Sequence, residues 1–359
     1  MDYIINPMLT YIIFFIISLL FSFIDFAKIN SIRKKGIFIL FTSGIILFMG
    51  GRFYCDNDYS NYISFFNETP PLHKMDYSTF MNIYLLYQVE PLFFLFSSIF
   101  KMIGLGGQSI IFFYAICTFT FFSIFILRTS SFPFISLFLY STCYFSLPFM
   151  QMRFGLASAC CIYAILKLNN GQSLSYWKWQ IIAMLFHFTA LVGLAYFFIR
   201  KLKITPKYTY IILLSSLLLL FFPIRSLYSS FVNLIGMSRY LGYLNEGSLS
   251  LSSTFLHVIV FSPLYIFHNQ LRNTMPEYDM FLKLSLLSIL MMVVSTQLPI
   301  LTRFALLFAT SSCCFIPAYI SLVKKDNRNI IIVWTFICFY ALLKFYPSLQ
   351  HIDSYHFFI

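Results

Sequence analysis

The sequence predicts an all-α, polytopic integral membrane protein that forms a single transmembrane domain over residues 1–359. Three observations predict this class. Hydrophobic residues make up 60% of the chain and its mean hydropathy is +0.82, which is too apolar for a soluble domain. Apolar runs of membrane-spanning length recur along the whole chain. Basic residues gather in short runs between these segments, the positive-inside pattern of multi-pass membrane proteins.

The apolar runs divide the chain into about twelve predicted transmembrane helices. The first two cover residues 8–26 and 37–51. The third begins at the Glu90-Pro91 pair, because proline is tolerated in the first turn of a helix, and ends near Lys101. In order, the remaining spans cover residues 109–127, 134–149, 151–168, 180–199, 208–222, 254–267, 280–298, 304–323 and 330–345.

The charges of the loops orient these spans. The most basic loops, at residues 28–35, 200–207 and 324–328, fall on one side, which we assign to the cytoplasm. Two longer loops, 52–88 and 223–253, fall on the outer side, and residues 77–87 of the first loop are predicted to form a helix lying in the interface. This count places Arg128 outside and Arg153 inside. Two short or re-entrant helices, near Phe149 and His187, would instead put Arg153 on the outer face.

A polar stretch at residues 50–66, GGRFYCDNDYSNYISFF, directly follows the second predicted span. It carries Arg52, Asp56, Asp58, Tyr59 and Tyr62 in a chain with only 10% charged residues. In a helix, Arg52 would lie one turn from Asp56, and Asp58 one turn from Tyr62. A cation, carboxylates and phenols would then share one patch at the membrane surface. The alternative is a solvated loop that aromatic residues anchor in the interface.

Charged groups in or beside membrane spans are costly and are therefore candidate functional groups. Four of these candidates are Arg52, Arg153, Arg239 and Arg303. Arginines that face one cavity would form an anion site, because the guanidinium fork matches phosphate oxygens with two hydrogen bonds. An arginine near a helix end can instead extend to the lipid headgroups.

Three further candidates have structural alternatives. Glu90 can be a carboxylate that only marks a helix start. His187 can be a buried packing residue, a proton-transfer group near neutral pH, or a hydrogen-bonding partner of a phosphate or sugar. Asp58 can be a general base, or it can hold Arg52 or cap the interfacial helix. Tyrosine and phenylalanine rings of the outer loop can stack on sugars or belong to the interfacial belt.

Several functions are not indicated. The net charge of +12 is spread over loops between apolar segments, which does not point to nucleic acid. Seven of the eight cysteines fall in or at apolar runs, so neither a disulfide framework nor a zinc site is supported. The sequence has no glycine-rich phosphate loop, HExxH motif or Asp-rich metal motif, and it indicates no metal and no cofactor. The first apolar run lacks a basic n-region, so we expect a retained helix rather than a signal peptide.

A series of short motifs resembles a known family. It consists of Gly51-Arg52-Phe-Tyr, Asp58-Tyr59-x-x-Tyr62-x-x-x-Phe66, Glu90-Pro91, Met152-Arg153-Phe-Gly-Leu-Ala157 and Phe186-His187-Phe-Thr-Ala190-Leu191. In order and spacing, over about the first 200 residues, this series resembles the EpsG-like branch of the Wzy-type polymerases of bacterial O-antigen, capsule and exopolysaccharide. The C-terminal half matches in its hydrophobicity, an arginine-bearing outer loop and Arg303 at the start of a span. The family commonly has glutamine where Phe154 stands here.

The resemblance implies an inner-membrane glycosyltransferase with a fold similar to the polytopic GT-C class. Its substrates would be undecaprenyl-diphosphate-linked oligosaccharide repeat units. The growing chain would move from its lipid carrier onto the non-reducing end of a new unit at the periplasmic face. Asp58 or His187 would be the catalytic base, and the implied partners besides the lipid bilayer are a chain-length regulator and a flippase. The candidate substrate-binding residues are Arg52, Tyr59, Tyr62, Glu90, Arg153, Arg239 and Arg303.

Two other classes of protein stay open. A flippase or other transporter of lipid-linked oligosaccharide would bind the same diphosphate without chemistry, but it should carry inverted internal repeats, and none is evident. A membrane acyltransferase that modifies a glycan would pair a histidine with an acidic or asparagine partner. His187 has no such partner nearby in the sequence.

Overall fold

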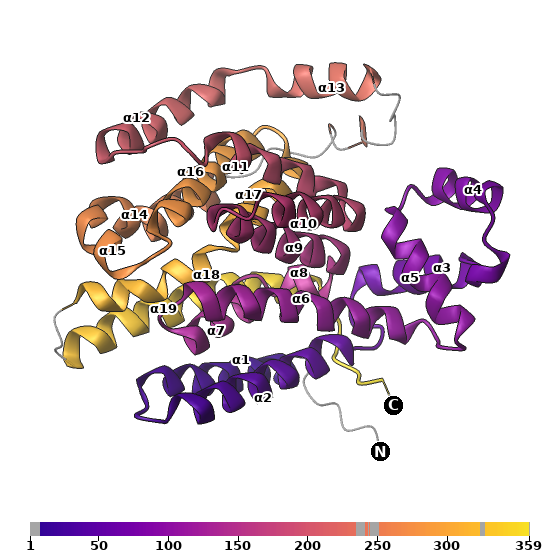
Figure 1. The fold of residues 1–359 in the computed structure, drawn as a ribbon, viewed down its shortest axis with the longest axis horizontal. Coiled ribbons are helices and arrows are strands. Elements are labelled where there is room, and N and C mark those ends of the chain that lie inside the picture. The colour runs from indigo at the N-terminus through magenta and orange to yellow at the C-terminus, as the bar shows by residue number, and fades with distance from the viewer. Residues whose placement is uncertain (1–7, 235–240, 243, 245–250, 324–326, 359) are drawn as a thin grey trace.

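The computed structural model describes residues 8–234, 241–242, 244, 251–323 and 327–358 (Figure 1). Within them the chain folds into helices and forms no β-strand. Five helical segments are long and apolar enough to cross a membrane, or seven if two bent helix pairs each count as one span. The five are Leu9–Phe26, Gln108–Thr129, Tyr278–Ser295, Pro299–Leu322 and Asn327–Ser348. The protein is therefore an all-α, multi-pass membrane protein.

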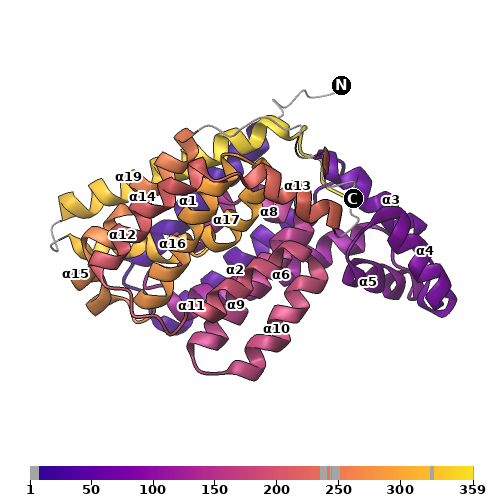
Figure 2. The same cartoon turned by 90° about the horizontal axis from the view of Figure 1, so that it is seen from above.

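The first third of the chain builds one edge and one end of the molecule. Two antiparallel helices, α1 (Leu9–Ser22) and α2 (Ser31–Gly50), lie along the edge. Three shorter helices project from the end where α2 finishes, in both views (Figures 1 and 2). They are α3 (Asn57–Glu68), α4 (Tyr77–Tyr87) and α5 (Pro91–Met102), and we call this end the α3 end. The bounds of α4 confirm the helix predicted at residues 77–87.

The middle of the chain supplies the core. Its elements are α6 (Gln108–Thr129), α7 (Pro133–Cys143), α8 (Ser146–Phe149), α9 (Met152–Asn169), α10 (Ser173–Phe186), the 3-10 helix η3 (Phe188–Gly193) and α11 (Leu194–Ile199). The central helix is α9, which is largely buried and packs between α6 and α10. Small residues permit this close packing. A Cβ atom at Gly155, for example, would lie only 2.6 Å from the carbonyl oxygen of Leu147 in α8, which also packs on α9.

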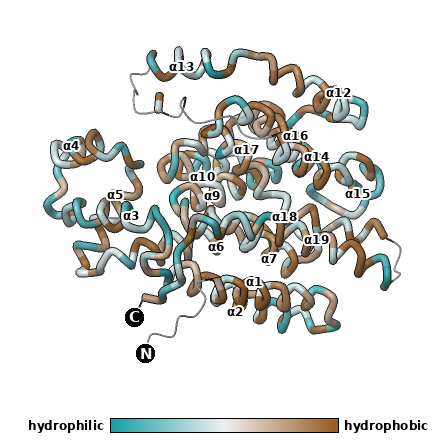
Figure 3. The backbone as a smooth tube through the Cα atoms, turned by 180° about the vertical axis from the view of Figure 1, so that it is seen from behind, coloured by the Kyte–Doolittle hydropathy of each residue, from teal (hydrophilic) through white to brown (hydrophobic). Residues whose placement is uncertain are grey.

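The C-terminal part covers the other face of α9. Its elements are α12 (Pro206–Ser216), η4 (Leu217–Phe221), α13 (Ile224–Leu234), α14 (Leu251–Ile266), α15 (His268–Thr274), α16 (Tyr278–Ser295), η6 (Pro299–Leu301), α17 (Thr302–Ala309), α18 (Ser312–Phe315), η7 (Pro317–Leu322), α19 (Asn327–Ser348) and η8 (Leu349–His351). Hydrophobic residues cover most of the long helices, while hydrophilic residues gather towards helix ends and over α3 (Figure 3). We call the end opposite α3 the basic end, because the first turn of α2, which carries Lys34, and Arg200, which follows α11, lie there.

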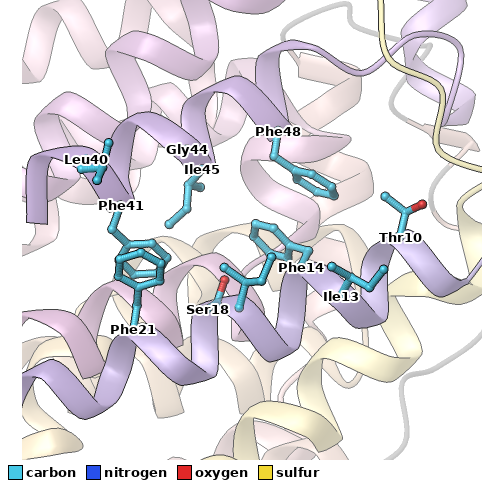
Figure 4. Close-up of a pocket in the computed structure, with 11 residues that line it drawn as sticks. Thr10, Ile13, Phe14, Ser18, Phe21, Leu40, Phe41, Gly44, Ile45 and Phe48 are labelled. Carbon is cyan, nitrogen blue, oxygen red and sulfur yellow. The ribbon is translucent and has the colours of Figure 1, made fainter. Parts of the chain in front are cut away.

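An apolar groove of about 400 Å³ separates α1 from α2 (Figure 4). The two helices are bridged by stacked rings, with Phe14 4.3 Å from Phe48 and Phe21 4.4 Å from Phe41. Elsewhere α1 packs on α7 while α2 packs on α6, which leaves the groove open between them. No charged side chain lines it.

The third predicted span does not cross the molecule. Its helix, α5, has 12 residues and is therefore about 18 Å long, against roughly 30 Å of hydrocarbon. Both its ends lie at the α3 end, because Lys101 donates a hydrogen bond to the Asn67 carbonyl of α3 and Gly107 lies against Ile63 of α3. The physical reason is the short apolar run, which Lys101 and the following glycine-rich turn bring to an end. Consequently α6 starts at the α3 end and carries Arg128 to the basic end.

The seventh predicted span, residues 180–199, is wrong as a single helix. The chain leaves the helix at His187, whose backbone is extended, and then turns back. Gln180 donates a hydrogen bond of 2.7 Å to the carbonyl of Ala190. In a continuous helix these residues would be about 15 Å apart. The break at His187 is one of the two that would place Arg153 on the outer face, and Arg153 does lie at the α3 end, in contact with Glu90.

Candidate functional site

Arg52 lies in a short non-helical segment just after α2 and is completely buried. Its Nε donates to Asp56 Oδ2 at 2.9 Å, and its Nη1 donates to the carbonyl of Met49 at 2.6 Å. The guanidinium carbon also lies 4.9 Å from the centre of the Phe149 ring. Its third nitrogen, Nη2, is buried and has no hydrogen-bond partner among the described residues. Arg52 is thus fixed in place with one donor group unused.

Asp56, rather than Asp58, pairs with Arg52, and the helix predicted at residues 77–87 is capped by Asp76. Besides pairing with Arg52, Asp56 accepts a hydrogen bond of 3.0 Å from the backbone N–H of Asp58 and so caps the N-terminus of α3. A carboxylate is well suited to this position, because the first N–H groups of a helix lack backbone partners. The Asp58 side chain is left for another role.

Asp58 lies in the first turn of α3, half-buried and outside the membrane-spanning segments. Burial raises the pKa of its carboxyl group above the usual value of 3.8, although the charges of Arg153, Arg303 and Arg52 act in the opposite direction. These three arginines come from distant parts of the chain. The Asp58 carboxylate forms no hydrogen bond and no ion pair with any of the described residues. It is therefore a partly exposed carboxylate without a protein partner among the described residues, in the electric field of three arginines.

Glu90 connects three further elements at this end. It precedes α5, and its carboxylate accepts a hydrogen bond from Nη1 of Arg153, in the first turn of α9. Its other oxygen lies 3.3 Å from the backbone N–H of Phe188, at the start of η3. The guanidinium of Arg153 lies 5.8 Å from the ring centre of Tyr62, while its Nε is buried without a partner among the described residues. Glu90 thus orients Arg153 and still leaves it a free donor.

His187 lies beside this pair, and its hydrogen bonds fix its tautomer. The backbone N–H of Thr189 donates to His187 Nδ1 at 3.3 Å, so Nδ1 must carry a lone pair. The ring proton of neutral His187 is then on Nε2. Glu90 Oε1 is 3.6 Å from Nδ1, too long for a hydrogen bond. In this state His187 offers a ligand a hydrogen-bond donor at Nε2.

The two tyrosines of the polar stretch are buried, and their hydroxyl groups have partners in the protein. Tyr62 donates to the carbonyl of Met150 at 3.1 Å. Tyr59 donates to Oε1 of Gln108, whose Nε2 donates in turn to the carbonyls of Gly50 and Arg52, at 2.6 and 3.1 Å. The structure therefore gives both tyrosines positioning contacts around Arg52 and Arg153.

The structure brings most of the predicted site residues together at the α3 end. They are Arg52, Asp58, Tyr62, Glu90, Arg153, His187 and Arg303. Arg303 is half-buried in the first turn of α17, which packs on α9. Arg239 lies outside the described residues. Gln108 and Phe149 were missed from the sequence, where a lone amide at a helix start and one phenylalanine among 47 carry little signal.

These features define a multi-pass α-helical membrane protein with an arginine-rich site at the α3 end. The family comparison is more specific. The chain matches the EpsG family over residues 35–358 and belongs to that family, which comprises Wzy-type polysaccharide polymerase-like proteins. The predicted family is confirmed, and the match extends through the C-terminal half. No curated protein and no solved structure matches the chain.

Proposed function

We propose that this protein polymerises undecaprenyl-diphosphate-linked oligosaccharide repeat units, by glycosyl transfer at the periplasmic face of the bacterial inner membrane. The observation that carries the proposal is the set of three arginines around Asp58, a carboxylate with no partner among the described residues. Membership of the EpsG family supports a role in polysaccharide biosynthesis. The predicted GT-C-like fold belongs to this proposal, while the predicted count of twelve spans does not survive the corrections at α5 and at His187.

The arginines suit the leaving group of such a reaction. A diphosphate carries several negative charges, and more charge develops on the departing oxygen as the glycosidic bond breaks. Arg153 and Arg303 lie in the first turns of α9 and α17, where the helix dipole adds to their positive charge. Arginine can also hold two phosphate oxygens with one planar fork. These groups would stabilise the transition state more than the bound substrate.

Asp58 suits the acceptor side of the reaction. The acceptor hydroxyl attacks the anomeric carbon of the donor, a new C–O bond forms, and the bond to the diphosphate oxygen breaks. The hydroxyl proton passes to Asp58 and from there to water. Burial raises the pKa of the Asp58 carboxyl group, which makes its ionised form a stronger base. His187 would donate a hydrogen bond from Nε2 to the sugar or the phosphate.

A flippase is the main competing function, because it needs the same anion site. An unpartnered carboxylate among the arginines favours transfer chemistry, since it would repel a diphosphate in a site built only for binding. A membrane acyltransferase is disfavoured because its histidine would have to act as a base, whereas Nδ1 of His187 accepts from the backbone of Thr189.

The glycan made by a deletion strain tests the proposal. We expect loss of long polysaccharide chains while single repeat units still reach the cell surface. Loss of all surface repeats, with lipid-linked units trapped on the cytoplasmic side, would instead identify a flippase. Re-expression of the intact chain should restore the long chains, and re-expression of Asp58→Asn should not.

A further inference from the structure

A segment outside the motif series packs directly on the Arg52 segment. After η8, residues 352–358, which we call the C-terminal strap, run antiparallel to residues 51–56. The backbone N–H of Asp353 donates to the carbonyl of Cys55 at 3.0 Å, and that of Phe358 donates to Gly51 at 2.8 Å. In return, the N–H of Phe53 donates to the carbonyl of His356 at 2.9 Å. The C-terminal strap therefore lies beside the segment that joins α2 to α3, at the α3 end (Figure 1).

Two tyrosine hydroxyls fasten the strap to the membrane helices. Tyr355 in the strap donates to the carbonyl of Phe48 in α2 at 2.7 Å, and its ring stacks on Phe48 with 4.6 Å between ring centres. Tyr11 in α1 donates to the carbonyl of Asp353 at 3.0 Å. The strap is thus fixed to α1 and α2 on one side and to the Arg52 segment on the other.

The Arg52 segment depends on these partners for its shape. It is neither helix nor strand, so its backbone N–H and C=O groups need partners from elsewhere. Tyr54 has φ of +47°, an unfavourable left-handed conformation for a residue other than glycine. Asp56 ends the segment and caps α3, two residues before Asp58. A shift of the segment would therefore move Arg52, Asp56 and the start of α3 together.

We propose that the C-terminal strap positions the site, and that Tyr355 and Tyr11 act through it on Arg52 and Asp58. This inference rests on the proposed function for the role of Asp58, but its first test does not. The strap holds the backbone at residues 51–56 in one register, so that Asp58 faces the arginines. A displacement of about 1 Å in a reacting group can lower turnover by as much as roughly 10²-fold.

Cys55 provides a readout that does not depend on activity. Its side chain is 0% exposed, and its Sγ accepts a hydrogen bond of 3.2 Å from the backbone of His356. The variants are Tyr11→Phe combined with Tyr355→Phe, and a chain that ends at Ile352. We expect a water-soluble maleimide to label Cys55 at least about ten-fold faster in both, because the strap opens more often. Tyr346→Phe, at a tyrosine 63% exposed on α19, is the matched control. The same variants with Cys55→Ser measure labelling of other cysteines.

Turnover of purified protein on lipid-linked repeat units then tests positioning. We expect kcat to fall by about 10-fold to 10²-fold in the strap variants while KM and the yield of folded protein stay close to those of the intact chain. Unchanged labelling of Cys55 in the truncated chain would contradict the proposal that the strap holds the Arg52 segment. Fast labelling with normal kcat per folded molecule would show a structural role only and would overturn the positioning role. An intact protein that makes no polymer would refute the proposed function, and the labelling rates would still decide whether the strap holds the segment.

Discussion

Asp56 and Asp58 are two residues apart, yet their surroundings give them different roles. Asp56 is buried against Arg52 and caps α3, whereas the Asp58 carboxylate has no partner among the described residues. Asp58→Asn keeps the size of the side chain but cannot accept a proton. We expect this variant to fold normally and to bind lipid-linked repeat units, yet to lose polymerisation by roughly two orders of magnitude or more. The measurement is product length on a gel after reaction of purified protein.

Asp56→Ala is the matched comparison for that prediction. It removes the helix cap and leaves the charge of Arg52 buried without its carboxylate, which costs about 3–5 kcal/mol. We therefore expect Asp56→Ala to lose polymerisation because it folds poorly, with a low yield of folded protein and a lower unfolding temperature. Asp58→Asn ladders of normal length would exclude Asp58 as the base and would leave a mechanism in which the arginine-held leaving group suffices.

The pH dependence of activity follows from the environment of Asp58. Its pKa is raised above 3.8 by burial and lowered by three arginines. A base must be ionised, so activity falls as the pH falls through this pKa, and the acidic limb should lie above that of an ordinary carboxyl group. Arg303→Gln removes one of the lowering charges. We therefore expect its acidic limb at higher pH than in the intact protein, measured as kcat/KM against pH. If the acidic limb of Arg303→Gln stays at the pH of the intact protein, the charge of Arg303 does not act on Asp58.

Most residues of the site could be predicted from the sequence, because a charge in an apolar chain stands out. Their pairings could not. Glu90 lies 63 residues from Arg153, and only the fold brings the two side chains together. The sequence also could not decide between Asp56 and Asp58 as the partner of Arg52 and the cap of α3. Either aspartate can cap a helix or pair with Arg52 on spacing alone, and the choice depends on where α3 begins.

At the scale of elements, hydrophobicity predicts an apolar run but not where the run turns back. Residues 180–199 form one continuous run in the sequence. The reversal at His187 depends on two hydrogen bonds. Gln180 donates one to the carbonyl of Ala190, and the backbone N–H of Thr189 donates the other to the ring of His187. In α5 the error had a simpler origin, because a run of 12 residues was counted as a span. The helix at residues 77–87 was predicted correctly as α4, while its position in the membrane interface stays a prediction.

Gly193 tests this reversal. A Cβ atom there would lie 2.3 Å from Sγ of Cys161 and 2.9 Å from Oε1 of Gln180. We expect Gly193→Ala to destabilise the protein by about 1–3 kcal/mol through overpacking. Gly36→Ala is the control, because nothing lies within 4 Å of its Cβ position and alanine favours the α2 helix by up to about 1 kcal/mol. Thermal unfolding of the purified protein in detergent should separate the two. Equal stability would mean that α10 and η3 do not pack as closely as described.

At the scale of the whole molecule, composition predicted the class of fold, and the assignment of loops to sides from their charges stays a prediction. Both arguments average over many residues, which makes them insensitive to single errors. Neither argument predicts the C-terminal strap, because residues 352–358 carry no motif and their partners lie about 300 residues away in the sequence. Backbone pairing of this kind uses N–H and C=O groups that every residue has, so the sequence holds no signal for it.

The two errors in the predicted spans, at α5 and at residues 180–199, cancel for the loops that follow residue 199. They change the predicted side of the loops between them, which labelling can detect. A chain in which α5 crosses the membrane would place Ser131 on the same face as Asn61. The structure places Ser131 at the basic end, since Ile135 donates to Asp25 and Asp25 accepts from Lys34. Gln172 follows α9 at that end as well, while Gly106 lies beside α3.

We therefore expect single cysteines at Asn61 and Gly106 to react with an impermeant thiol reagent from the periplasm. Cysteines at Ser31, Ser131 and Gln172 should react only after the membrane is opened. The reason is that α6 and the pair α9–α10 each carry the chain between the two ends. Cysteine-free protein that still makes polymer is the background, which shows that the labelled molecules are folded. Labelling of Ser131 from outside would restore α5 as a span and would remove Arg153 from the face that holds Asp58.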